Sequence, residues 1–480
     1  MKQRPEPADL DDIQGLVYSG WGEHPYAAYI FATLGDDVAR SRAWLAALRP
    51  QVSSSALGKY GDGDRLNIAL SPGGLAKLGV AQEVLDAIPQ EAKNGMASRA
   101  RILADDEPAT WELGRDNELD VLVMVFARDP ERRAVAVIEQ REALVAAGAT
   151  VRDAELSFPL GGKEHFGFSD GVSQPTIEGL PKQRAGAEPP IPTGEILLGY
   201  ENAYGKLPAS PHWDGFDLGA NGSYLVFRKL HQHVDRFWGY VAAQARALES
   251  DPAAAAELTE KLAAKLLGRW KSGAPLVLSP DRDDPTYATP ERANAFGYLE
   301  EDPYGMRCPI SSHVRRANPR DGRGGSAEES LDVVRRHRIL RRGRSYGLPM
   351  ADAEALAGRD DGRSRGLYFI SLQASIARGF EFIQQTWLSN PGFMGLFAEP
   401  DPIMGNGDGT AEVSIPASPV RLRLANVPSV VTVMGGGYFF LPSLAALERL
   451  SLTAAASRSD VAGNPSRQEQ VAQNRELGDM

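Results

Sequence analysis

The apolar positions of the first 150 residues change their spacing several times, from near-continuous runs to helical repeats. Near-continuous runs at 25–34 and 119–126, and a shorter one at 66–70, are typical of strands. Apolar residues at helical spacing follow the first run and end near Pro50, and a second helical segment runs from Pro130 to Gly148. The order strand, helix, strand, strand, helix predicts an α+β sandwich of the ferredoxin-like kind.

A similar order returns in the second half of the chain. The predicted elements there are a strand at 223–227, a helix at 231–247, a strand at 366–372, a helix at 376–388 and a strand at 430–441. We therefore predict fold class α+β with two ferredoxin-like halves, residues 1–215 and 216–455. Residues 456–480 are poor in apolar side chains, so we predict a disordered tail there.

The amino-acid composition argues against several classes of protein. The 480 residues include 52 Lys and Arg against 63 Asp and Glu, a net charge of -11, which argues against a nucleic-acid or membrane-surface partner. The single cysteine, Cys308, excludes an intramolecular disulfide and any Cys-rich metal site. No apolar run approaches the roughly 18 residues that a membrane span needs, and the first residues are polar. We expect a cytoplasmic protein.

The first candidate for chemistry is Asp170, which lies in the stretch from Phe166 to Pro175. The backbone of a glycine-flanked turn can fix a carboxylate in place beside buried apolar groups, and a carboxylate held in this way is suited to proton transfer. The same Gly-x-x-Asp-Gly pattern recurs at 358–362 and 405–409, where the simpler interpretation is a solvated turn. Asp170 differs only in its apolar neighbours, and on the residues alone a structural turn is favoured over a catalytic one.

The second candidate is His313, at the start of an arginine-rich region. Between Arg307 and Arg344 there are eleven arginines and four acidic residues, which indicates an anionic ligand, although a nucleic-acid patch would have the same composition. A neutral imidazole is a common ligand for a metal or haem iron, and guanidiniums such as Arg315 and Arg320 suit haem propionates. The alternative is an exposed basic loop with an ordinary histidine. His231 and His233 are expected at a helix start, where their side chains would point in different directions, so surface positions are favoured over a metal pair.

Together these stretches resemble the dye-decolorizing peroxidases, haem enzymes with two ferredoxin-like halves. The resemblance covers most of the chain, from Asp11-Asp12-Ile13-Gln14-Gly15 to Gly436-Gly437-Tyr438-Phe439-Phe440-Leu441-Pro442. It implies that Asp170 is the distal acid–base residue and His313 the proximal iron ligand. It also implies a distal arginine within the Arg341-Arg342 doublet, where the preceding Ile339-Leu340 pair favours Arg341.

The resemblance further implies haem b, bound mainly by the second half. Asp401 is similar to the carboxylate that hydrogen-bonds the proximal histidine, and Leu367 and Phe369 are similar to the apolar residues that roof the distal pocket. The implied activity is peroxidation: hydrogen peroxide is reduced, and dyes, phenols and similar organic donors are oxidised. The alternative is a haem carrier, sensor or iron-releasing protein without rapid turnover.

Gly343 stands where some members of this family have a distal asparagine, so we do not expect their manganese chemistry. Large dyes are not expected to pass the roof of the pocket, and oxidation at a surface aromatic residue is the expected route for them. Trp387, Tyr346 and Tyr368 are the candidates, against the simpler interpretation that each is core packing. The sequence leaves open whether the chain forms a homo-oligomer.

Overall fold

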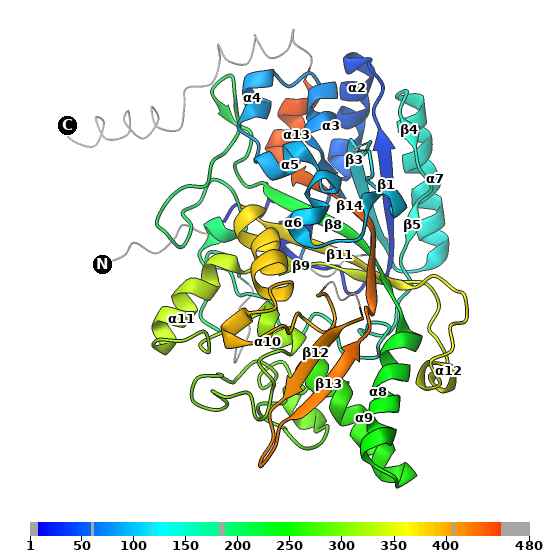
Figure 1. Cartoon of the computed structure of the whole chain (residues 1–480). Coiled ribbons are helices and arrows are strands. Elements are labelled where there is room, and N and C mark those ends of the chain that lie inside the picture. The colour runs from blue at the N-terminus through cyan, green and yellow to red at the C-terminus, as the bar shows by residue number, and fades with distance from the viewer. Residues whose placement is uncertain (1–7, 59–61, 117, 182–187, 406–408, 453–480) are drawn as a thin grey trace, which may run out of the picture.

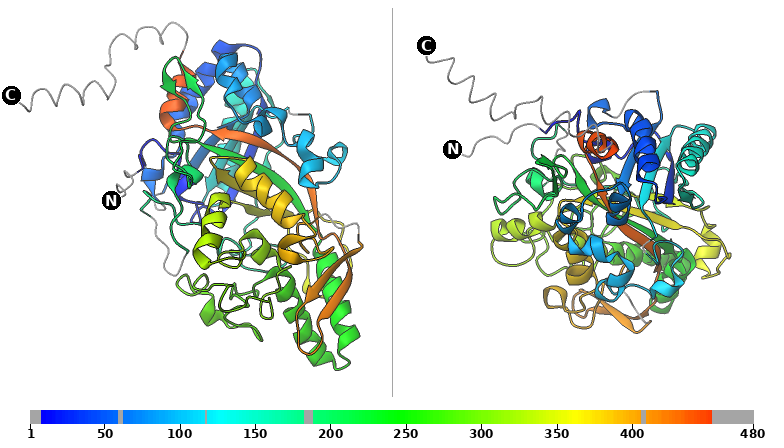
Figure 2. Two further views of the ribbon diagram at one scale, coloured as in Figure 1. Left: turned by 60° about the vertical axis from the view of Figure 1, so that its left-hand side comes forward. Right: turned by 90° about the horizontal axis from the view of Figure 1, so that it is seen from above.

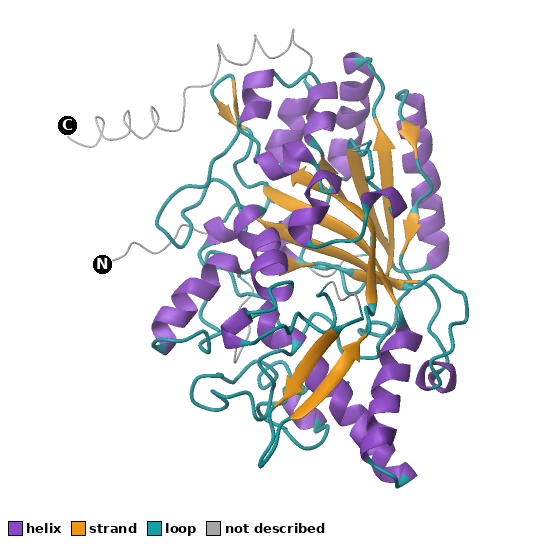
Figure 3. Cartoon of the chain, viewed as in Figure 1, coloured by secondary structure: helices purple, strands orange, loops and turns teal. Residues whose placement is uncertain are grey.

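The computed structural model describes residues 8–58, 62–116, 118–181, 188–405 and 409–452. Its centre is one large antiparallel sheet, crossed by helices on one side and by extended segments on the other (Figures 1 and 3). The strand order is β10-β11-β8-β14-β2-β3-β1-β4, with β5 paired to β1 and β9 paired to β11. The predicted tail at 456–480 lies outside the described residues.

The two ends of the sheet are formed by different parts of the chain. The bounds at one end of the sheet are β1 (Tyr26–Thr33), β2 (Arg65–Leu70), β3 (Val121–Ala127), β4 (Thr150–Val151) and β5 (Glu155–Leu156). At the other end they are β8 (Ser223–Gln232), β9 (Leu340–Arg341), β10 (Arg344–Tyr346), β11 (Gly366–Gln373) and β14 (Val431–Leu441). The α+β fold class is confirmed. The boundary between 1–215 and 216–455 stays a prediction, because β14 pairs with β2 and the core is continuous across that junction.

The remaining strands form two separate hairpins. They are β6 (His212–Trp213) with β7 (Phe216–Asp217), and β12 (Ala411–Ile415) with β13 (Leu422–Val427). The α-helices are α1 (Gly15–Tyr18), α2 (Val38–Leu48), α3 (Pro72–Lys77), α4 (Gln82–Asp86), α5 (Gln90–Asn94), α6 (Ala100–Leu103), α7 (Pro130–Ala146), α8 (Val234–Leu248), α9 (Pro252–Leu267), α10 (His313–Ala317), α11 (Ala327–Val334), α12 (Asp352–Leu356) and α13 (Leu444–Ser451). Two consecutive π-helical segments, η8 (Ala377–Glu381) and η9 (Ile383–Leu388), form the predicted helix at 376–388.

Strand alternation gives the sheet two buried faces. Ile30 and Val123 lie on the face covered by α2, α7 and α13, and Phe31 and Phe126 lie on the opposite face, against the segment that precedes β1. In the C-terminal strands the same face is turned toward α10 and η9, and residues of these strands and helices line one pocket. In Figure 1 and the left view of Figure 2, helices α8 and α9 and the hairpin of β12 and β13 lie below the sheet. None of the described helices is long and apolar enough to cross a membrane.

One predicted boundary is wrong. The helix expected at 231–247 begins at Val234, because β8 continues to Gln232 while it pairs with β11 on one side and β14 on the other. His231 is therefore a strand residue and His233 is the residue that precedes the helix. Their ring centres lie 4.5 Å apart, so the two imidazoles are neighbours and do not point apart as expected.

Candidate active site

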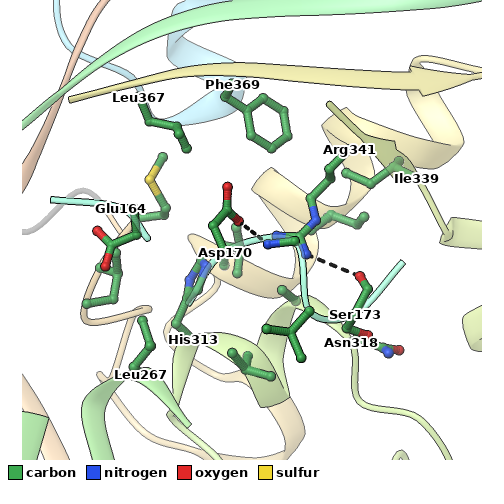
Figure 4. Close-up of a pocket in the computed structure, with 18 of the residues that line it drawn as sticks. Glu164, Asp170, Ser173, Leu267, His313, Asn318, Ile339, Arg341, Leu367 and Phe369 are labelled. Atoms are coloured by element: carbon green, nitrogen blue, oxygen red, sulfur yellow. Dashed lines mark hydrogen bonds between the residues drawn. The ribbon is translucent and has the colours of Figure 1, made fainter. Parts of the chain in front are cut away.

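A pocket of about 240 Å³ lies between the C-terminal end of the sheet and the helices packed against it. Figure 4 shows the side chains of Asp170, His313 and Arg341 pointing into it, each from a different part of the chain. The sheet contributes Leu230, Leu367 and Phe369, and most of the other walls are apolar. The structure thus brings together residues that are more than 170 positions apart in the sequence.

The sheet side of the pocket follows from strand alternation. Leu367 and Phe369 on β11 both face the pocket, and Tyr368 between them points to the opposite core. The two arginines at the end of β9, Arg341 and the following Arg342, also point to opposite faces. Arg341 lines the pocket and donates from Nη2 to the Ser173 carbonyl at 3.1 Å, whereas Arg342 donates to the carbonyls of Leu16 and Val17 on the other face.

Asp170 is held by a tightly bonded loop. The carboxylate of Glu164 accepts hydrogen bonds from the N–H groups of Phe166 and Phe168 at 2.8 and 2.9 Å, and from the side chain of Gln232. Burial raises the pKa of Glu164 to about 7, although these three donors lower it. Asp170 itself donates from its backbone N–H to Gly162 and leaves its carboxylate exposed to the pocket. These bonds position the loop, and the Asp170 carboxylate, which accepts from the Gly171 N–H at 2.6 Å, faces the pocket.

The other two Gly-x-x-Asp-Gly segments have different surroundings. Asp361 accepts from Arg363 N–H and pairs with Arg365 in an exposed turn away from the pocket. Asp408 lies outside the described residues. The apolar flanks of Asp170, and not the motif, separated it from Asp361.

His313 is the first residue of α10, and its Nδ1 lies 3.1 Å from both carboxylate oxygens of Asp401. Asp401 is 2 % exposed and also accepts from the N–H groups of Ile403 and Met404. Burial alone would raise the pKa of Asp401, but His313, Arg316 and the Met404 N–H outweigh burial and lower it. An ionised Asp401 holds the proton on Nδ1 and leaves Nε2 as the nitrogen available to a ligand.

A cationic wall, formed by Arg269, Arg320 and Arg338, closes one edge of the pocket. All three guanidiniums are buried, yet only Glu188 forms ion pairs with them among the described residues, at 3.3 Å to Arg320 and 2.5 Å to Arg338. Burial and Arg320 lower the pKa of Arg269 to about 10. Three positive charges against one negative charge leave an excess of two on this wall, which matches a ligand with two carboxylates.

The wall corrects one prediction. Arg315 does not line the pocket, because its guanidinium pairs with Asp302 at 3.1 Å and donates to the Cys308 carbonyl at 2.7 Å. Sequence analysis missed Arg269, Arg338 and Glu188. Arg338 lies in the arginine-rich region between Arg307 and Arg344. Arg269 and Glu188 lie outside that region, and no motif near them in the sequence indicates a binding site.

Three further expectations concern side chains around the pocket. A Cβ atom at Gly343 would lie 2.8 Å from the Tyr368 carbonyl oxygen, so the position has no room for an asparagine side chain. Trp387, Tyr346 and Tyr368 are 1 %, 5 % and 2 % exposed, so the prediction that one of them is a surface aromatic is wrong. The alternative interpretation, core packing, describes all three.

The donor set fits an iron porphyrin. Nε2 of His313 is a nitrogen donor of the kind that holds haem iron, and the described residues contain no group of three His, Cys, Asp or Glu side chains that could hold a metal ion. A porphyrin supplies four nitrogens, an apolar ring for Leu367 and Phe369, and two carboxylates for the cationic wall. The pocket therefore fits haem in its donor atom, its apolar surface and its charge.

Comparisons with known proteins give the same answer. Residues 211–394 match the family model described as Dyp-type peroxidase, C-terminal. The chain is 33% identical to a dye-decolorizing peroxidase of Exidia glandulosa over 92% of this chain and 86% of that one. It superposes on the crystal structure of a fungal DyP-type peroxidase from Auricularia auricula-judae with a TM-score of 0.79 and 28% identity, covering 93% of this chain and 99% of that one. A dye-decolorizing peroxidase in complex with 2,6-dimethoxyphenol gives a TM-score of 0.79 and 27% identity, with 92% and 99% coverage. The chain belongs to the dye-decolorizing peroxidase family.

Proposed function

We propose that this protein is a haem b peroxidase that reduces hydrogen peroxide and oxidises phenols and dyes. The observation that carries the proposal is the composition of one pocket, in which a carboxylate-bonded histidine, an exposed carboxylate and an arginine meet. Family membership supports the same activity. A haem carrier has no use for an acid and a guanidinium directed into the ligand space, whereas peroxide cleavage uses both.

His313 would hold the iron through Nε2, and the cationic wall would hold the propionates. Leu367 and Phe369 would cover the ring on the sheet side. When bound, haem supplies an iron centre that gives electrons to peroxide and later takes them from a reductant. Asp401 keeps the imidazole of His313 in one tautomer and one orientation, since its carboxylate is itself fixed by two backbone N–H groups.

Asp170 and Arg341 have different roles in the cleavage of hydrogen peroxide. Asp170 takes the proton from the inner oxygen and returns it to the outer oxygen, which then leaves as water. Arg341 places a positive charge beside the oxygen on which negative charge develops, and its bond to the Ser173 carbonyl orients the guanidinium. A carboxylate base stays ionised to lower pH than a histidine base, so this pair suits reaction in acid.

The proposed reductants are phenols and larger aromatic donors. A dye-decolorizing peroxidase of similar structure has been solved in complex with 2,6-dimethoxyphenol, which supports a phenol as the first donor to test. Manganese oxidation is not proposed, because Gly343 leaves no space for an additional ligand side chain.

The test is peroxide-dependent oxidation of 2,6-dimethoxyphenol by the haem-loaded protein and three variants. His313→Ala should lose haem, and Asp170→Asn should keep haem but lose activity by about 10²–10⁴-fold. Asp361→Asn is the matched control, since it changes the same motif in an exposed turn, and should retain activity. A wild-type protein that holds haem and turns over no phenol, or an Asp170→Asn variant as active as Asp361→Asn, would overturn the proposal.

A further inference from the structure

The structure places His231 and His233 side by side at the end of β8. Residues two apart on an extended strand point to the same side of a sheet. Both imidazoles are partly exposed, and their ring centres lie 4.5 Å apart with 70° between the ring planes. Gln232, between them, lines the pocket and donates to Glu164 at 2.6 Å. The two histidines therefore form a pair on the side of the strand that faces away from the pocket.

The separation of the two rings matches two imidazoles on one metal ion. An imidazole nitrogen lies about 2.0–2.1 Å from a bound divalent ion, which puts the ring centre about 3.2 Å from that ion. Two imidazoles at right angles on one ion then have centres about 4.5 Å apart, which is the separation observed here. Right angles between neighbouring ligands are typical of tetragonal Cu²⁺ and Ni²⁺ sites.

Each ring also keeps a nitrogen for a ligand. Oγ1 of Thr432 lies 2.8 Å from Nε2 of His233. A histidine that binds a metal ion donates its other ring N–H to an oxygen in this way, which fixes the tautomer and leaves Nδ1 of His233 as the ligand atom. His231 forms no side-chain hydrogen bond with any described residue. Gly366 is its partner on β11, so no side chain from that position covers the imidazole.

The charges near the pair do not exclude a cation. Arg365 and Arg236 oppose a positive charge on His231, whereas Asp360 and Glu112 favour one. Arg365 is further neutralised by an ion pair of its own. The nearby charges are therefore close to balance, and the net charge of -11 on the whole chain attracts cations.

We propose that His231 and His233 form a binding site for a divalent transition-metal ion of the class of Cu²⁺, Ni²⁺ and Zn²⁺. Imidazole suits all three ions, and the affinity of a nitrogen site is highest for Cu²⁺. The described residues contain no group of three His, Cys, Asp or Glu side chains that could hold a metal ion, so water completes the coordination. The site lies outside the pocket and does not rest on the proposed function.

Affinity is measured by calorimetric titration of the haem-loaded protein with Cu²⁺ at pH 7.5, without peroxide and with glycine as a weak competitor for copper. Wild type should bind one Cu²⁺ tightly at this pair. His231→Gln and His233→Gln should each weaken that binding at least about 10-fold, since even the loss of an outer partner of a ligating histidine costs about 10- to 100-fold. His212→Gln is the matched control, because His212 is an exposed histidine that lies 3.9 Å from Asp217 and has no second imidazole beside it. It should bind Cu²⁺ like wild type.

The number of imidazoles on the ion is measured without any substitution, by electron spin resonance of Cu²⁺ bound to the wild-type protein. We expect nitrogen couplings from two imidazoles in wild type and from one in each single variant at the pair.

Equal Cu²⁺ affinity in His231→Gln, His233→Gln and His212→Gln would overturn the site and show an adventitious ion only. A wild-type spectrum with couplings from one imidazole, or from none, would overturn it as well. A protein that binds Cu²⁺ through both imidazoles but oxidises no phenol would support the metal site and contradict the proposed function alone.

Discussion

Replacing Asp401 by asparagine removes one charge from beneath His313 and leaves the side-chain shape nearly unchanged. Oδ1 of Asp401 accepts from Ile403 and Met404 at 2.8 and 2.7 Å, and both oxygens lie 3.1 Å from His313 Nδ1. An asparagine that keeps its oxygen toward the two backbone donors still offers that oxygen to Nδ1, but replaces the second oxygen by an amide donor. The Nδ1 proton then faces one neutral acceptor in place of a carboxylate, so its hydrogen bond is weaker.

The magnitude follows from the lost contact. A hydrogen bond to a charged group contributes about 1.5–3 kcal/mol, and at about 1.4 kcal/mol, or 59 mV, for a tenfold change in a one-electron equilibrium this equals about 60–130 mV. The carboxylate stabilises the more positive, oxidised iron, so its loss should raise the reduction potential by that amount. Haem affinity should fall about 10- to 100-fold.

The assay is a spectroscopic redox titration, with haem transfer to apomyoglobin as the measure of affinity. Asp120→Asn is the control, because Asp120 is also buried, at 4 % exposed, but immediately precedes β3 at the other end of the sheet and pairs with Lys77. It should leave the potential unchanged. A folded, haem-loaded Asp401→Asn protein with the wild-type potential would refute the role given to Asp401.

Three further results are expected. Arg341→Leu should slow the reaction with peroxide about 10²–10³-fold, as measured by stopped-flow absorbance. Arg342→Leu should lower the midpoint of urea unfolding and leave the rate per folded molecule within a few-fold of wild type. The reverse pattern would contradict the assignment of Arg341 to the pocket. Asp170→Asn should remove the acid-side fall in that rate between pH 3 and 8, and a profile with the parent's shape would exclude Asp170 from proton transfer. Burial lowers the pKa of His165 to about 4, so the folded state takes up its proton later than the unfolded state and stability falls as the pH drops from 6.5 toward 4. His165→Gln should reduce this loss by about 2–3 kcal/mol in urea unfolding at pH 7 and pH 4.5; an equal loss in both proteins would show that His165 does not cause it.

Local patterns predicted the strands and helices of the sheet well, because β1, α2 and β3 bury residues at the spacing that their own sequence shows. The start of α8 was misplaced, since the length of β8 is decided by partners more than 130 residues away. The arginines show the same limit. Strand alternation predicts that Arg341 and Arg342 point to opposite faces. No residue near Arg315 in the sequence indicates that its guanidinium will form an ion pair with Asp302.

We propose that this pocket holds haem and uses it to reduce peroxide. The most direct test is the absorption spectrum of the purified haem-loaded protein during addition of one equivalent of hydrogen peroxide and then of 2,6-dimethoxyphenol. We expect a Soret band that changes within milliseconds and returns after two equivalents of phenol, over many cycles. No Soret band, a band that peroxide leaves unchanged, or bleaching with release of iron at the first addition would contradict it.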